Sequence, residues 1–340
     1  MALLEIPREI RLSILNFVIS SPVNPPASPS KTQRGRKQLR QKAWLGYAWI
    51  ASAIWQLPPQ SSSALSLLLV NKQINIETRH VIEHAPDKYH VDVMFLKDYG
   101  LWTTWSIPAL PRTRYIESVH ATFRIFEPQG LKTRFRDSMK FDYTSIGPPW
   151  SSWSLYQMLM SLLRAGPGYV YSLRRWDYEK SATSQYVVKN IIIDVLAPSD
   201  GVEHKSMMVN NKDYEERLEW LSDDIDDNNS IPMENRLATY MCNSLNTLLT
   251  LDYDSLNYGA LVYEGVQEKI QILVNGRLFR EFNIEEMEAS ISVQYFGELP
   301  DRTEDRKEKY QKWKAWLAER RQRMKEGLEL DNNRPVEKII

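Results

Sequence analysis

The sequence predicts an α+β or mixed α/β fold, in which a helical N-terminal segment precedes a body of strands and helices and a charged C-terminal helix. Two hydrophobic spacings carry this prediction. Apolar residues alternate with polar ones over short runs, as in half-buried strands, and recur every three or four residues over longer runs, as on one helix face. No short repeat period is visible, so the sequence does not favour a solenoid or a propeller.

Composition shifts divide the 340 residues into three parts. Residues 1–85 form a predicted helical module with a disordered, basic insertion at about 20–45, rich in Pro and Ser at its start. Residues 86–300 form an α/β body. Residues 301–340 form a charged helix and a tail.

Within the first part, apolar spacing predicts a helix near residues 10–18 and a second helical region over residues 63–85. Residues 20–30 interrupt the first helix and predict a flexible, partly extended linker. The apolar run at residues 44–55 predicts a further short helix. We therefore expect a small all-helical unit around a long insertion.

The body contains alternating segments that predict strands and periodic segments that predict helices. An apolar run at 191–196 predicts a strand buried on both faces, and Asn275-Gly276 between two apolar runs predicts a hairpin. The expected strands lie at 91–95, 119–125, 191–196, 270–274 and 278–282, and the expected helices at 155–163 and 237–249. Near the C-terminus, Tyr310, Trp313 and Leu317 share one face, which predicts a surface helix docked by that stripe.

Charge and cysteine content exclude several classes of protein. Lys+Arg and Asp+Glu both number 43, so the formal net charge is zero and general nucleic-acid or membrane binding is not favoured. Cys242 is the one cysteine, which excludes an intramolecular disulfide and a cysteine-based zinc cluster. No apolar run is long enough to span a bilayer and no signal peptide is recognisable. We expect an intracellular protein, cytoplasmic, nuclear or both, without a membrane partner.

Motifs for catalysis or metal binding are weak. His80-Val81-Ile82-Glu83-His84 matches the H-x-x-E-H order of inverted zinc proteases and places two histidines on one helix face, but no partner motif follows. Asp252-Tyr253-Asp254 and the acidic run 223–227 fit solvated loops better than cation sites. No nucleophile elbow, P-loop or dinucleotide fingerprint is present. The sequence predicts no enzyme, catalytic residue, metal or cofactor.

A dense basic run follows the predicted linker and is a candidate for nuclear localisation or nucleic-acid binding. No acidic residue interrupts it, although a solvated loop is the favoured interpretation. Its basic residues are Lys31, Arg34, Arg36, Lys37, Arg40 and Lys42. As an alternative function, this run and the C-terminal helix would serve a nuclear protein- or nucleic-acid-interaction protein.

Two N-terminal segments carry a family resemblance. The run 4–15, Leu-Glu-Ile-Pro-Arg-Glu-Ile-Arg-Leu-Ser-Ile-Leu, resembles the opening of an F-box, and the run 67–74, Leu-Leu-Leu-Val-Asn-Lys-Gln-Ile, is similar to its later segment. Together they resemble the F-box-like proteins abundant in filamentous fungi. The sequence departs from that pattern at Asn71, where cysteine is usual, at Ile74, where tryptophan is common, and by the insertion at 20–62.

The resemblance implies a non-enzymatic adaptor, which docks on a Skp-type adaptor of a cullin ubiquitin ligase and presents a protein substrate through residues 86–300. An F-box exposes an apolar face, whose burial against the partner contributes roughly 25 cal/mol per Å². Carried over to this chain, the partner-binding residues are Ile6, Pro7, Ile10, Ile14, Leu15, Leu68, Leu69, Val70 and Lys72. The alternative is that the same apolar residues form an internal core.

Overall fold

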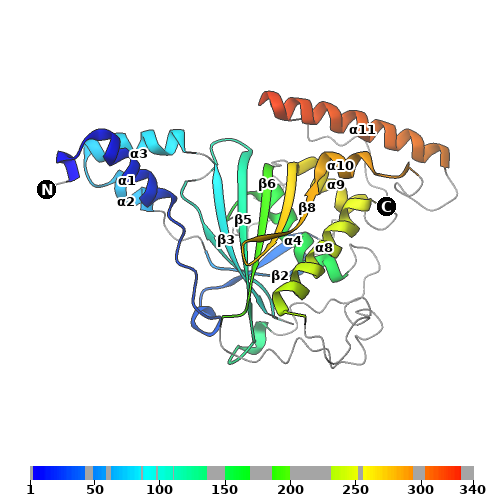
Figure 1. Cartoon of the computed structure of the whole chain (residues 1–340), viewed down its shortest axis with the longest axis horizontal. Helices are drawn as coiled ribbons and strands as arrows, with labels where there is room; N and C mark the ends of the chain where they lie inside the picture. The colour runs from blue at the N-terminus through cyan, green and yellow to red at the C-terminus, as the bar shows by residue number, and fades with distance from the viewer. Residues whose placement is uncertain are drawn as a thin grey trace.

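The computed structural model describes residues 3–42, 49–58, 63–85, 87–96, 99–109, 111–135, 150–168, 186–199, 231–251, 256–293 and 303–330. The fold is mixed α/β, as predicted: one mixed sheet carries helices on one face, and a group of short N-terminal helices lies beside one end of the sheet (Figure 1).

The strands form a single eight-stranded sheet in the order β1-β2-β4-β3-β5-β6-β7-β8. Their bounds are β1 Lys37–Lys42, β2 Trp49–Gln56, β3 Lys88–Leu96, β4 Gly100–Ser106, β5 Tyr115–Phe126, β6 Val187–Leu196, β7 Val266–Val274 and β8 Arg277–Asn283. The central strands β3, β5, β6 and β7 are parallel, whereas β4, β8 and β1 pair antiparallel to their neighbours β3, β7 and β2. β2 and β4 are parallel.

The helices divide into an N-terminal group, a group that connects the parallel strands, and a C-terminal helix. Their bounds are α1 Arg8–Ser20, α2 Ser63–Leu68, α3 Lys72–His84, α4 Trp150–Ala165, α8 Met233–Thr250, α9 Leu256–Gly265, α10 Ile284–Ala289 and α11 Thr303–Glu326, with short 3-10 turns at Leu3–Glu5, Ser30–Thr32 and Thr133–Phe135. Parallel strands need crossover connections, so α4 links β5 to β6, and α8 and α9 link β6 to β7.

The main hydrophobic core lies between the sheet and α4, α8 and α9. Alternate residues of the strands, such as Val93, Phe123 and Ile193, point to this face and are fully buried. The predicted helices at 155–163 and 237–249 are confirmed as parts of α4 and α8. β6 is buried on this face, but its opposite side chains, such as Asp194, are half-buried, so the prediction of burial on both faces was wrong.

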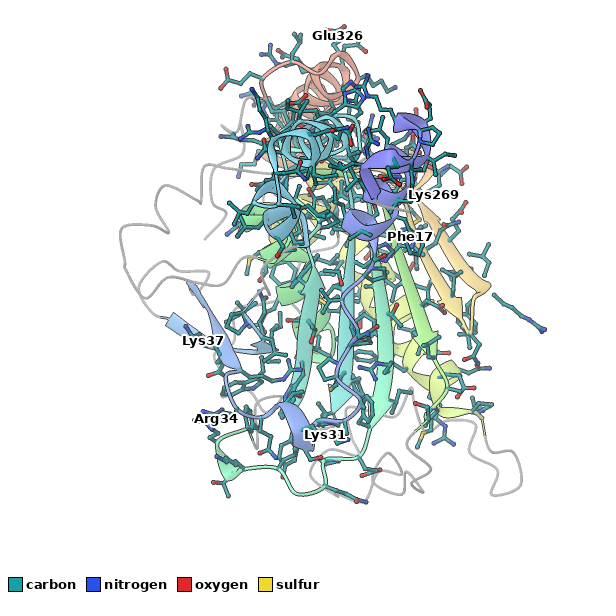
Figure 2. All side chains as sticks on the ribbon, turned by 90° about the vertical axis from the view of Figure 1, so that its left-hand side faces the viewer. Phe17, Lys31, Arg34, Lys37, Lys269 and Glu326 are labelled. Carbon is teal, nitrogen blue, oxygen red and sulfur yellow. The ribbon has the colours of Figure 1, made fainter. Side chains whose placement is uncertain are left out.

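The opposite face of the sheet is more polar, and an N-terminal segment crosses it (Figure 2). A smaller apolar cluster around Trp102 lies at one end of this face. Along β3 and β5, Asp92 and Arg124 form an ion pair of 2.6 Å. The segment after α1 is attached here, because the Val23 amide donates to Ser106 Oγ (2.8 Å) and Arg124 Nη2 donates to the Pro26 carbonyl (2.8 Å).

Two predictions for the insertion were wrong. Residues 37–42, within the predicted disordered segment, form β1, and residues 49–56 form β2 instead of a helix. The segment Trp-Ile-Ala-Ser-Ala-Ile-Trp-Gln is apolar and short, and a strand buried between two neighbours has this composition too. Since β2 pairs with β4 of the body, the insertion belongs to the sheet and the 1–85 boundary does not separate two units.

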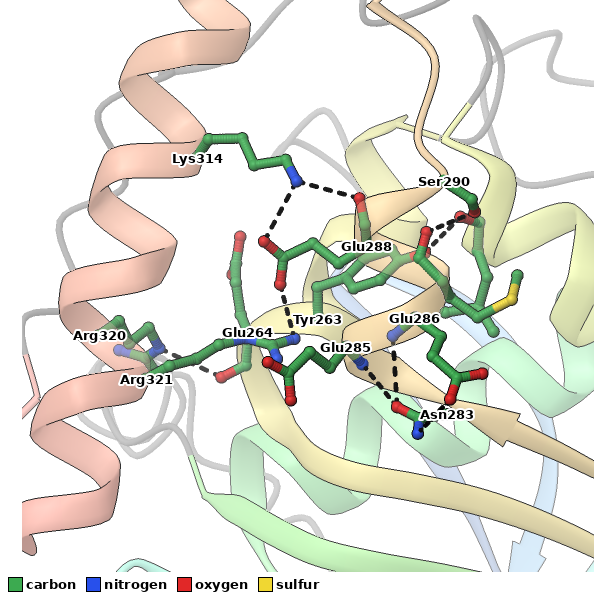
Figure 3. A network of polar contacts seen from close by, with 12 residues as sticks. Tyr263, Glu264, Asn283, Glu285, Glu286, Glu288, Ser290, Lys314, Arg320 and Arg321 are labelled. Atoms are coloured by element: carbon green, nitrogen blue, oxygen red, sulfur yellow. Dashed lines mark hydrogen bonds and ion pairs between the residues drawn. The ribbon is translucent and has the colours of Figure 1, made fainter.

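The C-terminal helix α11 docks on the body through the predicted stripe, with Trp313 and Leu317 fully buried. Polar contacts to α10 and α9 add to this apolar contact (Figure 3). Glu288 binds Arg321 Nη2 (3.0 Å) and Lys314 Nζ (3.4 Å), and Arg320 Nε donates to the Glu264 carbonyl (3.1 Å). The expected docking of this helix is confirmed.

Candidate partner-binding site

The N-terminal helices α1, α2 and α3 form a compact unit with a core of its own, which we call the three-helix module. α1 contributes Leu15 and Ile19 to this core, and α3 contributes Ile74 and Val81. These residues recur at helical spacing, i and i+4 on α1 and i and i+7 on α3, so each helix turns one apolar stripe inward. The predicted second helical region is divided into α2 and α3 by a turn at residues 69–71.

Asn71 determines where α3 begins. Its side-chain carbonyl accepts a hydrogen bond from the Ile74 amide at 2.9 Å, which is the N-cap arrangement that Asn favours. Asn75 Nδ2 also donates to the Leu68 carbonyl at 2.5 Å and ties α3 back to α2. Asn71 therefore has a structural role at the start of α3, which the sequence prediction did not include.

A buried ion pair joins the first helix to the third. Arg11 Nε and Nη2 donate to the two carboxylate oxygens of Glu77, both at 2.6 Å, and the two side chains are only 5% and 6% exposed. Arg11 Nη1 also donates to the carbonyls of Ile6 (2.6 Å) and Leu4 (3.2 Å), so the same guanidinium holds the turn that precedes α1. Its hydrogen bonds hold the pKa of Glu77 below its ordinary value.

Much of the apolar surface of the module faces outward. Nine of the thirteen exposed large hydrophobic side chains within the described ranges belong to residues 4–76, although these residues are a minor part of the molecule. Those nine are Leu4, Ile10, Ile14, Phe17, Val18, Leu65, Leu69, Val70 and Ile76. This concentration of exposed apolar residues makes the module the candidate site for contact with another chain.

Most of the residues expected to bind a partner are accessible. Ile10 is 53% exposed, Leu69 78% and Val70 62%. Ile14, Pro7 and Lys72 are also exposed, whereas Ile6 and Leu68 are half-buried. Leu15 was assigned wrongly: it is 1% exposed and packs in the core of the module, because α1 turns its 11–15–19 stripe toward α3.

The sequence prediction missed Phe17, which is 75% exposed. It follows Ile10 and Ile14 at i+7 and i+3, so helical periodicity places the three side chains on one face of α1. Figure 2 shows Phe17 on α1, at the upper end of the segment that crosses the sheet. Leu65 and Ile76 were missed as well, and both are exposed.

The basic run is not a continuous free surface. Lys31, Arg34 and Lys37 are exposed; Lys31 and Arg34 lie near the end of the sheet away from Phe17, and Lys37 lies at its side (Figure 2). Arg36, in contrast, is buried: its Nη1 donates to the carbonyls of Trp55 (2.9 Å) and Thr103 (3.0 Å). Arg40 and Lys42 belong to β1, and their side chains lie outside the described residues. The interpretation of the run as a solvated loop or binding patch is wrong for Arg36.

Arg36→Ala is expected to lower the free energy of unfolding by about 2–4 kcal/mol, because two buried carbonyls lose a charged donor and Trp102 loses the guanidinium that lies 4.9 Å from its ring centroid. Burial lowers the pKa of Arg36 to about 9. Denaturant unfolding measures the loss. Arg34→Ala is the matched control, and an equal loss in both variants would contradict a structural role for Arg36.

The other motifs do not assemble a catalytic site within the described residues. His80 and His84 lie on one face of α3 with ring centroids 4.2 Å apart, but no group of three or more metal-ligating side chains occurs in the described ranges. Burial raises the pKa of the Cys242 thiol to about 11, which keeps it protonated at neutral pH. The 223–227 and 252–254 segments lie outside the described residues.

Comparisons with known proteins found no match: no family model, no curated protein and no solved structure is similar to this chain. Within the described residues, no helix is both long and apolar enough to cross a membrane.

Proposed function

We propose that the protein is a non-enzymatic adaptor, which docks through its three-helix module on a Skp-type adaptor of a cullin ubiquitin ligase and presents a protein substrate. The observation that carries this proposal is the concentration of exposed apolar side chains on a module that has a hydrophobic core of its own. It adds to the resemblance of residues 4–15 and 67–74 to the two F-box segments.

The chemistry of the surface supports a protein partner. Ile10, Ile14 and Phe17 form an apolar row on α1, and Leu69 and Val70 form an apolar turn between α2 and α3. The exposed Arg8 and Lys72 are the first residues of α1 and α3 and supply polar groups beside these apolar ones. An apolar centre with charged residues beside it is the usual composition of a protein interface.

The proposal rests on a fixed arrangement of these residues. The Arg11–Glu77 ion pair and the Asn71 cap determine how α1 meets α3 and where the turn between α2 and α3 lies. A preformed surface loses little conformational entropy when a partner binds. We therefore infer that this part of the chain docks as a folded unit.

The experiment is co-elution of the purified protein with a purified Skp-type adaptor, comparing wild type with Ile10→Asp/Leu69→Asp. Both side chains are exposed, so the variant is expected to fold normally while its affinity falls at least roughly 100-fold, as for the loss of two central contacts. Leu278→Asp/Phe279→Asp, which alters exposed apolar residues of the body, is the matched control and is expected to co-elute. Absence of wild-type binding, or binding by Ile10→Asp/Leu69→Asp, would refute the proposal.

A further inference from the structure

Among the residues that the structure describes, the outer strand β8 presents an unpaired edge of the sheet. β8 is last in the strand order, and β7 is its one partner among the described residues. Figure 1 shows it at the margin of the sheet, beyond β7. An edge strand carries backbone donors and acceptors that a further extended segment can pair with.

This edge is held in place at both ends. At the β7–β8 turn, the Asn275 amide donates to the Val195 carbonyl and the Gly276 amide to Asp194 Oδ1, both at 3.0 Å. Asn275 and Gly276 have positive φ angles of 50° and 76°, as a two-residue hairpin turn requires. At the other end, Asn283 caps α10 by accepting from the Glu285 and Glu286 amides (Figure 3). An added segment would meet a preorganised strand.

The two arginines of β8 lie on one face of the sheet, and the exposed Leu278 lies on the other. Arg277 and Arg280 pair with Val274 and Ile272, so they lie on the helix-covered face of the sheet. Leu278 pairs with Leu273, so it lies on the open face, and it is 58% exposed.

Phe279 and Glu281 determine how far regular strand pairing can extend along β8 and what charge its edge carries. Phe279 is the extra residue of a β-bulge and is 44% exposed. The one acid of the strand, Glu281, already binds Lys269 Nζ (3.1 Å) and Gln271 Nε2 (2.6 Å). The edge therefore presents two arginines, neither of which has an acidic partner on β8. It also presents exposed apolar groups.

We propose that β8 binds a short, extended acidic peptide segment by strand addition, with acidic side chains beside the two arginines and apolar side chains beside Leu278. This inference rests on the proposed function, because it names the class of substrate segment that the adaptor would present. The charge of the edge favours an acidic chain over a second copy of β8, which would bring a second excess of arginine to the same edge. The bulge at Phe279 limits regular pairing to a few residues.

The test uses three fluorescein-labelled synthetic peptides: Glu-Val-Glu-Val-Glu, Lys-Val-Lys-Val-Lys and Glu-Val-Pro-Val-Glu. Fluorescence anisotropy at low salt measures their binding to the full chain. We expect the first peptide to bind, with an affinity that falls as salt is added. The second should fail because of its charge, and the third because proline removes a backbone donor and interrupts the strand.

Arg277→Glu/Arg280→Glu should weaken binding of the acidic peptide at least tenfold. Lys307→Glu/Lys325→Glu on α11 changes the net charge equally and should bind as wild type does. The proposal would be overturned if the acidic peptide did not bind, if the proline peptide bound as tightly as the acidic one, or if Arg277→Glu/Arg280→Glu bound the acidic peptide as tightly as wild type does. Sedimentation evidence that β8 pairs two copies of the chain would also overturn it. The two proposals can be tested separately. Arg277→Glu/Arg280→Glu should still co-elute with the Skp-type adaptor, and Ile10→Asp/Leu69→Asp should still bind the acidic peptide.

Discussion

Leu15→Asp is expected to unfold the three-helix module, whereas Ile14→Asp at the neighbouring position leaves it folded. Leu15 is 1% exposed and packs with the residues of α2 and α3, so an aspartate there would bury a charge without a partner. The expected loss is about 4 kcal/mol or more of the free energy of unfolding. Ile14 is exposed, and its substitution should change stability by less than about 0.5 kcal/mol.

Circular dichroism in urea measures both variants, and adaptor binding separates the two effects. Leu15→Asp should lose binding because the module no longer folds, and Ile14→Asp should lose binding while its unfolding midpoint stays that of wild type. Similar stability losses in both variants would show that α1 does not turn its 11–15–19 stripe inward.

Glu77→Gln is expected to lower the melting temperature of the protein by about 5 °C at pH 7, because Arg11 stays buried without its counter-charge. The pKa of Glu77 is lowered from its ordinary value of 4.5, chiefly by the hydrogen bond from Arg11. The stabilisation from the carboxylate is therefore fully present above about pH 4.5 and is lost as the pH falls through the lower pKa of the folded state.

The difference in melting temperature between wild type and Glu77→Gln should accordingly shrink as the pH is lowered from 5 toward 3. Replacing both partners, with Arg11→Met/Glu77→Leu, should recover part of the loss, since the unpaired charge is then gone. Glu281→Gln, which alters an exposed ion pair with Lys269, is the matched control and should change little. A constant difference across this pH range would contradict the role given to the carboxylate.

Local hydrophobic patterns and one turn signal allowed the sequence to predict five of the eight strands. The strands around Val93, Phe123 and Ile193, and the Asn275-Gly276 hairpin, were all predicted from local spacing and are confirmed. β2 was mistaken for a helix because a short apolar run has no period that separates the two structures. Residues 49–56 form a strand because they pair with β4, which is distant in sequence.

The candidate site shows the same limit. Helical spacing placed Ile10 and Ile14 on one face, and extending that row to i+7 would also have found Phe17. Helical spacing did not show that Leu15, the residue after Ile14, points inward, because the inward direction depends on where α3 packs. Arg36 looked like one more solvated charge in a basic run, and its burial depends on carbonyls of β2 and β4 that no local pattern reveals.

The central claim, that the exposed apolar face of α1 is covered by the Skp-type adaptor, is tested most directly by photo-crosslinking. A benzophenone side chain at position 17, introduced as Phe17→p-benzoylphenylalanine, replaces the most exposed side chain of that row. The same change at Phe279 serves as the control. Our account predicts a crosslink to the adaptor from position 17 and none from position 279. No crosslink from position 17, or equal crosslinking from both positions, would contradict it.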